Sequence, residues 1–218
     1  MSTISDYTSL QAAAIEYLAR DQDTTLIARI PTFIQFAEAK LNRLLFTRHM
    51  EQRSFALTDP NATEPEFIAL PSDFQSMRRI RLSSVSGKPR LQFKNQQQMD
   101  EWRYTNGNTS GMPQFFGIFG TEIELAPTPD AAYTVEMVYR QNIPALNMGN
   151  TTNWLLTLAP DLYLYSTLLE AAPYMKEDDR ASLWSGAVTT AISDLNGLGN
   201  ISTFNAGPLA MRPIGVTP

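Results

Sequence analysis

The side chains that could perform chemistry in this chain are few and scattered. The sequence holds one histidine, His49, and no cysteine, so disulfides, zinc–thiolate sites and thiol catalysis are excluded. As a general base, His49 would need a nucleophile and an orienting acid, and no Gly-x-Ser-x-Gly motif marks a serine for that role. No glycine-rich phosphate loop with its lysine is present either. We therefore expect a structural or solvated His49 and no catalytic residue, cofactor or metal site.

Carboxylates occur in closely spaced pairs that could suggest acid–base chemistry. These pairs are Asp178-Asp179, Asp100-Glu101 and the alternating Glu122 and Glu124. A glycosidase needs two carboxylates facing each other across a cleft, and spacing along the chain does not establish that. Asp178 is better placed to cap a helix, since an anion favours a helix start. The other carboxylates are expected to lie on solvated faces.

A basic cluster, Arg78-Arg79-Ile80-Arg81, is the most concentrated charge in the middle of the chain. In an extended strand, Arg79 and Arg81 would share one face and Arg78 and Ile80 the other, because side chains alternate. The plain interpretation is an exposed, solvated sheet face. The functional alternative is a set of salt bridges to a neighbouring subunit, for which Arg78, Arg79 and Arg81 are the candidates.

Helical periodicity occupies both ends of the chain. Apolar residues recur at helical spacing in two segments before residue 46 and two after residue 159. The predicted helices are Ser9–Arg20 with Thr8 as a possible cap, Pro31–Leu45 after a short turn ending near Arg29, Pro160–Tyr174, and Asp178–Asn196. Pro31 is placed at a helix start because proline fits the first turn and breaks a helix interior. Gly197 is expected to end the last helix.

The middle of the chain has the punctuation of a β region, with Gly, Pro, Asn and Asp between short apolar runs. The predicted strands are Gln52–Leu57, Glu66–Leu70, Arg78–Ser83, Arg90–Phe93, Phe115–Phe119, Glu122–Leu125 and Thr134–Tyr139. Neither helical end alone offers a sensible core. We therefore predict an α+β fold in which residues 1–48 and 153–196 form one helical bundle, and residues 49–152 form an inserted antiparallel β domain.

Residues 197–218 differ from both regions and are predicted to form an extended C-terminal arm. They contain four glycines, three prolines and a single charge, Arg212. The entropy cost of ordering this backbone exceeds what its few apolar side chains return on burial, so the arm needs backbone pairing from a neighbour or from its own sheet. Its candidate docking residues are Ile201, Phe204, Leu209, Met211, Arg212, Ile214 and Val216.

Overall charge and hydropathy limit the partners. The net charge is −5, which disfavours phosphate binding by the whole surface. The amino terminus has no basic start followed by an apolar stretch, and no run approaches the ~18 apolar residues of a membrane span. We expect a soluble protein with no membrane partner.

Three stretches of the chain resemble a known family. They are Arg29–Leu45, with Arg-Ile-Pro-Thr-Phe-Ile and Ala-Glu-Ala-Lys-Leu-Asn-Arg-Leu-Leu; Ile123–Tyr139, with Ile-Glu-Leu-Ala-Pro-Thr-Pro; and Asn153–Trp184, with Asn-Trp-Leu-Leu and Pro-Asp-Leu-Tyr-Leu-Tyr. Their order and spacing over residues 24–196 resemble the head-to-tail adaptor (connector) proteins of tailed bacteriophages, the group that includes tail tubular protein A of short-tailed phages.

The resemblance implies a structural virion protein rather than an enzyme. It implies a ring, usually of twelve copies, beneath the portal protein in the neck of the virion. That ring would extend the DNA channel, let genomic DNA pass without sequence-specific binding during ejection, and dock tail or nozzle proteins. Such a protein is made in the cytoplasm of the bacterial host. The apolar arm fits insertion between portal subunits, since an extended segment can add a strand to a sheet.

Two alternatives remain open from the sequence. One is another structural component, such as a tail-completion or baseplate protein, that uses the β domain for docking. The other is a virion hydrolase that cleaves polysaccharide with a pair of carboxylates in the β domain.

Overall fold

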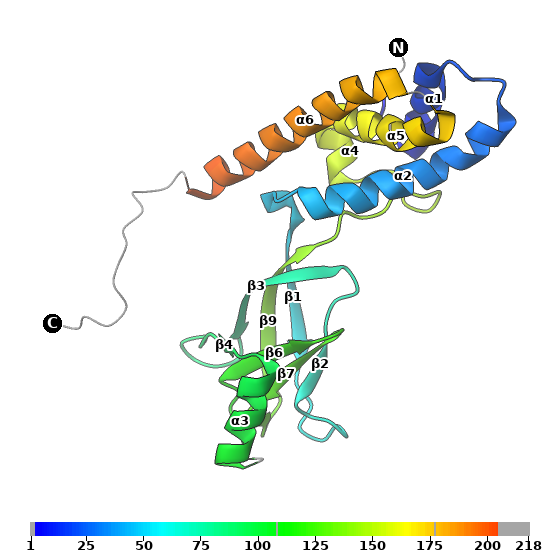
Figure 1. Cartoon of the computed structure of the whole chain (residues 1–218). Helices are drawn as coiled ribbons and strands as arrows, with labels where there is room; N and C mark the ends of the chain where they lie inside the picture. The colour runs from blue at the N-terminus through cyan, green and yellow to red at the C-terminus, as the bar shows by residue number, and fades with distance from the viewer. Residues whose placement is uncertain (1–2, 108, 177, 205–218) are drawn as a thin grey trace. The chain divides into compact units, whose positions relative to one another are not determined.

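The chain forms two compact units. One is assembled from two separate stretches of the sequence, and the other is a single continuous stretch. The computed structural model describes residues 3–107, 109–176 and 178–204, with backbone alone for residues 178 and 199–204. One unit comprises Met1–His49 and Ile143–Pro218, and the other comprises Met50–Asn142. The first is helical and the second is rich in strands (Figure 1), so the predicted α+β class is confirmed. The second boundary falls at Ile143, ten residues before the predicted Asn153.

The helical unit is built around α5. Its described helices are α1 (Tyr7–Leu18), α2 (Thr24–Leu44), α4 (Trp154–Leu158), α5 (Pro160–Met175) and α6 (Asp178–Phe204). Helix α5 contacts all four others, and its buried residues lie on every side of the helix axis. A helix covered on all sides needs neighbours from both ends of the chain, which explains why the amino- and carboxyl-terminal segments pack together.

Aspartate caps start the first two helices. Asp6 Oδ1 accepts a hydrogen bond of 2.8 Å from the Ser9 backbone N–H, and Ser9 Oγ accepts one of 2.9 Å from the Asp6 N–H. This reciprocal pair places the start of α1 at Tyr7, so the predicted cap at Thr8 is wrong. Asp23 caps α2 through hydrogen bonds from the backbone N–H groups of Thr25 and Leu26.

Helix α2 continues through Pro31, whereas a turn was predicted just before this proline. Leu26, Ile30, Ile34 and Leu41 are all buried on the face that packs in the helical unit. A break at Pro31 would rotate the two halves of that stripe relative to each other. The burial of a continuous stripe therefore outweighs the lost hydrogen bond, and the proline ring itself lies exposed.

Helix α6 also differs from its prediction, since it continues past Gly197 to Phe204. Gly197 does not adopt the positive φ of a helix cap, and a Cβ atom built there would meet nothing within 4 Å. Because no packing at Gly197 itself opposes the helix, α6 tolerates the glycine at a cost of about 1 kcal/mol. The predicted extended arm is therefore wrong for residues 197–204.

The buried face of α6 is narrower than its apolar stripe. Trp184 and Val188 are buried, whereas Leu183, beside Trp184 in the same stripe, is 72% exposed. Among the helices, only α5 makes extensive contacts with α6. A single neighbour covers one narrow stripe, so the flanking leucine remains in solvent.

The β unit contains two main sheets. The strands are β1 (Glu51–Leu57), β2 (Phe67–Ala69), β3 (Phe74–Leu82), β4 (Gln92–Phe93), β5 (Ser110–Gly111), β6 (Phe115–Phe119), β7 (Glu122–Ala126), β8 (Thr128–Pro129) and β9 (Thr134–Gln141), with helix α3 (Gln96–Asn106) between β4 and β5. One sheet has the order β1-β9-β3 and the other β2-β7-β6-β4. Short strands β5 and β8 form a third, two-stranded sheet.

The two main sheets share one apolar core and are not wholly antiparallel. Ile80, Met137 and Tyr139 from the first sheet pack with Phe116 and Ile123 from the second. Strand β4 runs parallel to β6, and β5 runs parallel to β8, because the chain between each pair crosses over through α3 or the β6–β7 hairpin. That hairpin turns at Gly120-Thr121, between the two strands predicted there, with Gly120 at φ +58°.

Candidate interaction surface

The side of the β1-β9-β3 sheet opposite the core carries charged and apolar side chains together. Along β9, Val135, Met137 and Tyr139 point into the core, so Glu136 and Val138 point the other way. The strand register places two residues opposite each of these, one from β1 and one from β3. We call the resulting surface the arginine face; its residues are Arg53, Phe55, Leu57, Arg79, Arg81, Glu136 and Val138.

Glu136 is the centre of the arginine face. Arg81 donates two hydrogen bonds to Glu136 Oε2, from Nε at 2.9 Å and Nη2 at 2.8 Å. Arg53 Nε lies 3.3 Å from Oε1 and Arg79 Nη2 lies 3.4 Å from the same atom. The hydrogen bonds from Arg81 hold the pKa of Glu136 below its ordinary value, against the opposing effect of desolvation. Three arginines thus share one carboxylate whose side chain is 1% exposed.

Apolar side chains flank these charges and remain in solvent. Phe55 is 52% exposed and Leu57 is 66% exposed. The Arg53 guanidinium lies 4.6 Å from the centre of the Phe55 ring, a cation–π contact that holds both side chains along the strand. A surface that mixes exposed rings with arginine has the composition of a protein interface more than that of a solvated sheet face.

The structure places the three predicted arginines in two environments. Arg79 and Arg81 share a face, as predicted, and both reach Glu136. The register shifts between Met77 and Arg79, so Arg78 is the extra residue of a β-bulge. Arg78 extends to Glu51, with Nη2 2.9 Å from Oε1, and remains 62% exposed. All three arginines have partners within the chain, and their contact with a neighbouring subunit stays a prediction.

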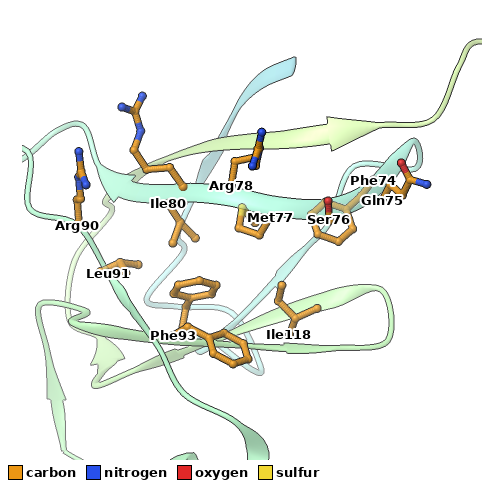
Figure 2. A pocket seen from close by; sticks show the side chains of 12 residues that line it. Phe74, Gln75, Ser76, Met77, Arg78, Ile80, Arg90, Leu91, Phe93 and Ile118 are labelled. Carbon is orange, nitrogen blue, oxygen red and sulfur yellow. The ribbon is translucent and has the colours of Figure 1, made fainter. Parts of the chain in front are cut away.

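A cleft opens between the two sheets, beside the outer edge of β3. It has a volume of about 580 Å³. Figure 2 shows Met77 and Ile80 on β3 pointing across the cleft toward Phe93 and Ile118, while Arg78 points away from it. Phe93 is 62% exposed and packs edge-to-face on Phe116 with ring centres 5.5 Å apart. We call this feature the inter-sheet cleft.

A buried polar network fixes the start of the carboxyl-terminal half within the helical unit. Glu38 Oε1 accepts hydrogen bonds from the Leu146 N–H at 2.8 Å and from the Tyr163 hydroxyl at 2.9 Å. Asn153 Nδ2 donates to the same hydroxyl at 2.7 Å. Burial raises the pKa of Glu38, and it also raises the pKa of Tyr163. Because Glu38 is only 5% exposed, we interpret this network as structural support for the loop after residue 142.

The proposed docking residues of the carboxyl-terminal arm lie at or beyond the end of the description. Ile201 and Phe204 fall in the last turns of α6. Leu209, Met211, Arg212, Ile214 and Val216 lie outside the described residues. The role of these residues in docking stays a prediction.

The chemical candidates from the sequence occupy ordinary positions. The His49 ring stacks on Trp154, with ring centres 5.4 Å apart and planes 16° apart. Glu124 accepts a hydrogen bond of 2.7 Å from Arg103 Nε, which ties β7 to α3. Within the described ranges, no group of three histidine or carboxylate side chains could hold a metal ion. A search of the same ranges finds no helix with the length and hydropathy of a membrane span.

Glu136 and Glu38 were not identified as important from the sequence. Glu136 lies between the apolar residues Val135 and Met137, and a carboxylate in such a place signals that a basic partner lies nearby. Its partners come from strands more than 50 residues away, so only the register reveals them. Glu38 and Asn42 lie one turn apart on α2, and both accept hydrogen bonds from the loop after residue 142.

One family model matches nearly the whole chain. The family model described as "SU10 adaptor protein" matches residues 5–212, which covers both units. The chain belongs to the SU10 adaptor protein family. Membership assigns it a structural role in the head–tail connection of a bacteriophage virion. No curated protein matches the chain.

Proposed function

We propose that copies of this chain assemble into a closed adaptor ring between the portal protein and the tail of a phage. The observation that carries the proposal is the family match, which extends over nearly the whole chain and includes both units. In this proposal twelve copies surround the DNA channel. The net charge of −5 suits a channel wall that lets DNA slide without gripping its phosphates.

The arginine face is proposed as one side of the contact between neighbouring copies. A cyclic ring needs two different patches on each copy, because the contact is head-to-tail. Exposed Phe55 and Leu57 supply apolar area, and Arg79 and Arg81 supply directional hydrogen-bond donors. Arg78, with most of its side chain exposed, can add a further contact at the edge of this patch.

The carboxyl-terminal arm is proposed as the element that docks on the portal. Helix α6 carries the chain as far as Phe204, with Ile201 near its end. The residues that follow are nearly uncharged and rich in glycine and proline, so they can adopt an extended form and pair with a sheet of another protein. Tail or nozzle proteins then dock on the surfaces of the ring that the portal leaves free.

Co-assembly with the portal tests this function. The purified chain is mixed with portal rings from the same phage, and the products are weighed by mass photometry and imaged by cryo-EM. The proposal expects one ring of this chain, with the symmetry of the portal, on a single end of each portal assembly. Portal rings that stay bare at micromolar chain concentration would contradict it.

A further inference from the structure

The inter-sheet cleft has a free strand edge along one wall. Strand β3 pairs with β9 on one side only. On its other side the segment before β4 covers the carboxyl-terminal half, through bonds from the Leu82 N–H to the Pro89 carbonyl and from the Leu91 N–H to the Ile80 carbonyl. From Ser76 to Arg79, no described strand pairs with that edge. A free edge is a template for one more strand.

The floor of the cleft is apolar and open. It is formed by side chains from β3, β4 and β6 and by Leu91 just before β4, namely Phe74, Met77, Ile80, Leu91, Phe93, Phe116 and Ile118. Phe93 keeps 62% of its surface in water although Phe116 lies beside it. A strand added along β3 would place every second side chain over this floor, because side chains of a strand alternate between faces.

The rim of the cleft is basic. Arg78, Arg79 and Arg90 line it, and Figure 2 shows Arg78 and Arg90 pointing away from the apolar floor. Arg90 is exposed, and no carboxylate of the described residues lies within ion-pair distance of it. Arg78 has Glu51, while Arg79 shares Glu136 with two other arginines. The rim therefore attracts negative charge although the protein as a whole is acidic.

The bulges in β3 make the edge selective. Register shifts fall between Phe74 and Ser76 and again between Met77 and Arg79. Bulges of this kind oppose pairing with an arbitrary strand. Recognition at this edge therefore depends on side chains that fill the cleft and meet the rim, in addition to backbone hydrogen bonds.

We propose that the inter-sheet cleft binds an extended segment of another virion protein, in which apolar residues alternate with carboxylates, and that this segment adds as a strand along Ser76–Arg79. Its apolar residues occupy the cleft and its carboxylates meet Arg78 and Arg90. The chain's own arm is a poorer match, since residues 195–218 contain no carboxylate and include Arg212. The inference rests on the proposed function in one respect, namely that the segment bound in the cleft belongs to a virion protein.

Site-specific cross-linking in assembled virions tests the inference. The chain has no cysteine, so Ser76→Cys creates one thiol beside the cleft for a benzophenone label. Thr105→Cys on the exposed surface of α3 is the matched control. Irradiated particles are digested and the cross-linked peptides identified by mass spectrometry. The expected result is a peptide of a different virion protein, containing Asp or Glu between apolar residues, from Ser76→Cys alone.

A charge reversal sharpens the result. Combined with Ser76→Cys, the double change Arg78→Glu and Arg90→Glu should lower the cross-link yield by about tenfold, whereas lysine at both positions should keep most of it. Cross-links only to a second copy of this chain, a yield equal to the control, or a yield insensitive to the reversal would overturn the inference. Particles that carry the ring without the cross-link leave the proposed function intact, whereas particles without this chain at the neck contradict that function.

Discussion

Glu136 shows how one residue can organise a surface. It is a carboxylate covered on all sides, and Arg81, Arg53 and Arg79 surround it at 2.8 to 3.4 Å. Removing a buried charge of this kind leaves its partners facing one another, which costs more than the pair itself contributes. The arginine face therefore depends on Glu136 for its shape, even though the arginines are the residues that a partner would touch.

Acidification should weaken the protein through Glu136. The folded-state pKa is depressed below the ordinary value of 4.5, so the stabilisation is present above that value and is lost as pH falls through the folded-state pKa. We expect Glu136→Gln to lower the melting temperature at neutral pH and to make its decline below about pH 4.5 shallower. Melting curves between about pH 3 and 7 check this, with the exposed Glu101→Gln as control. Parallel pH profiles for wild type and Glu136→Gln would contradict it.

Glu38 acts within the helical unit as a buried hydrogen-bond acceptor. Glu38→Ala would leave the buried Leu146 N–H and the Tyr163 hydroxyl proton without their acceptor, so we expect a loss of about 1–3 kcal/mol in unfolding free energy. Glu38→Gln keeps an oxygen in the same place and should cost much less at pH 7, because burial penalises the ionised carboxylate. Urea denaturation measures both. Equal losses for the two variants would show that charge is what matters.

At the scale of elements, α5 and α6 show what sequence patterns can and cannot predict. The Pro160 start of α5 and the existence of α6 follow from local signals. Which face of α6 is buried does not, because Leu183, Trp184, Ala187 and Val188 all belong to a broad apolar stripe. Only the position of α5 selects Trp184 and Val188 from it.

Trp184 should therefore be a stability residue and Leu183 should not. Trp184→Ala removes a large side chain that is 5% exposed, for an expected loss of about 3–5 kcal/mol in unfolding free energy. Leu183→Ala changes a side chain that is 72% exposed and should stay within about 0.5 kcal/mol of wild type. Denaturant titrations of both proteins give the comparison. A comparable loss for Leu183→Ala would mean that a partner or second copy covers that face in solution.

The same limit explains the errors in helix ends. Pro31 and Gly197 are strong local breakers, and each was predicted to end or start a helix. At Pro31, burial outweighs the local signal, because Ile30 and Ile34 on either side are buried in one stripe. At the second, nothing in the surroundings favours leaving the helix. Strand boundaries in β6 and β7 were predicted well because Gly120 alone supplies the positive φ at the hairpin turn.

At the scale of the whole molecule, the sequence predicts the α+β class, while the sites depend on contacts that no local pattern contains. The pairs that hold Glu136 and Glu38 join residues between 55 and 125 positions apart. Their geometry follows from strand register and from helix packing. The basic cluster at Arg78–Arg81 was visible in the sequence. Its arginines are divided between Glu51 and Glu136 by a β-bulge, which the sequence did not reveal.

Removing the arm should separate folding from assembly. A chain truncated after Phe204 keeps every described helix and strand, including the bonds between Asn196 and the end of α2. We expect its melting temperature to lie within about 3 °C of the full chain, since the loss corresponds to less than about 1 kcal/mol. The truncated chain should not sediment with portal rings, whereas the full chain should. A truncated chain that still binds the portal would show that another surface makes the contact.

The proposal that this chain forms the ring between portal and tail can be tested by cryo-EM of the virion neck. A reconstruction with the symmetry of the portal should contain a ring into which both units of this chain fit, with density continuing from Phe204 into the portal. A neck whose density below the portal is accounted for by another protein, with this chain located elsewhere in the particle, would contradict the claim.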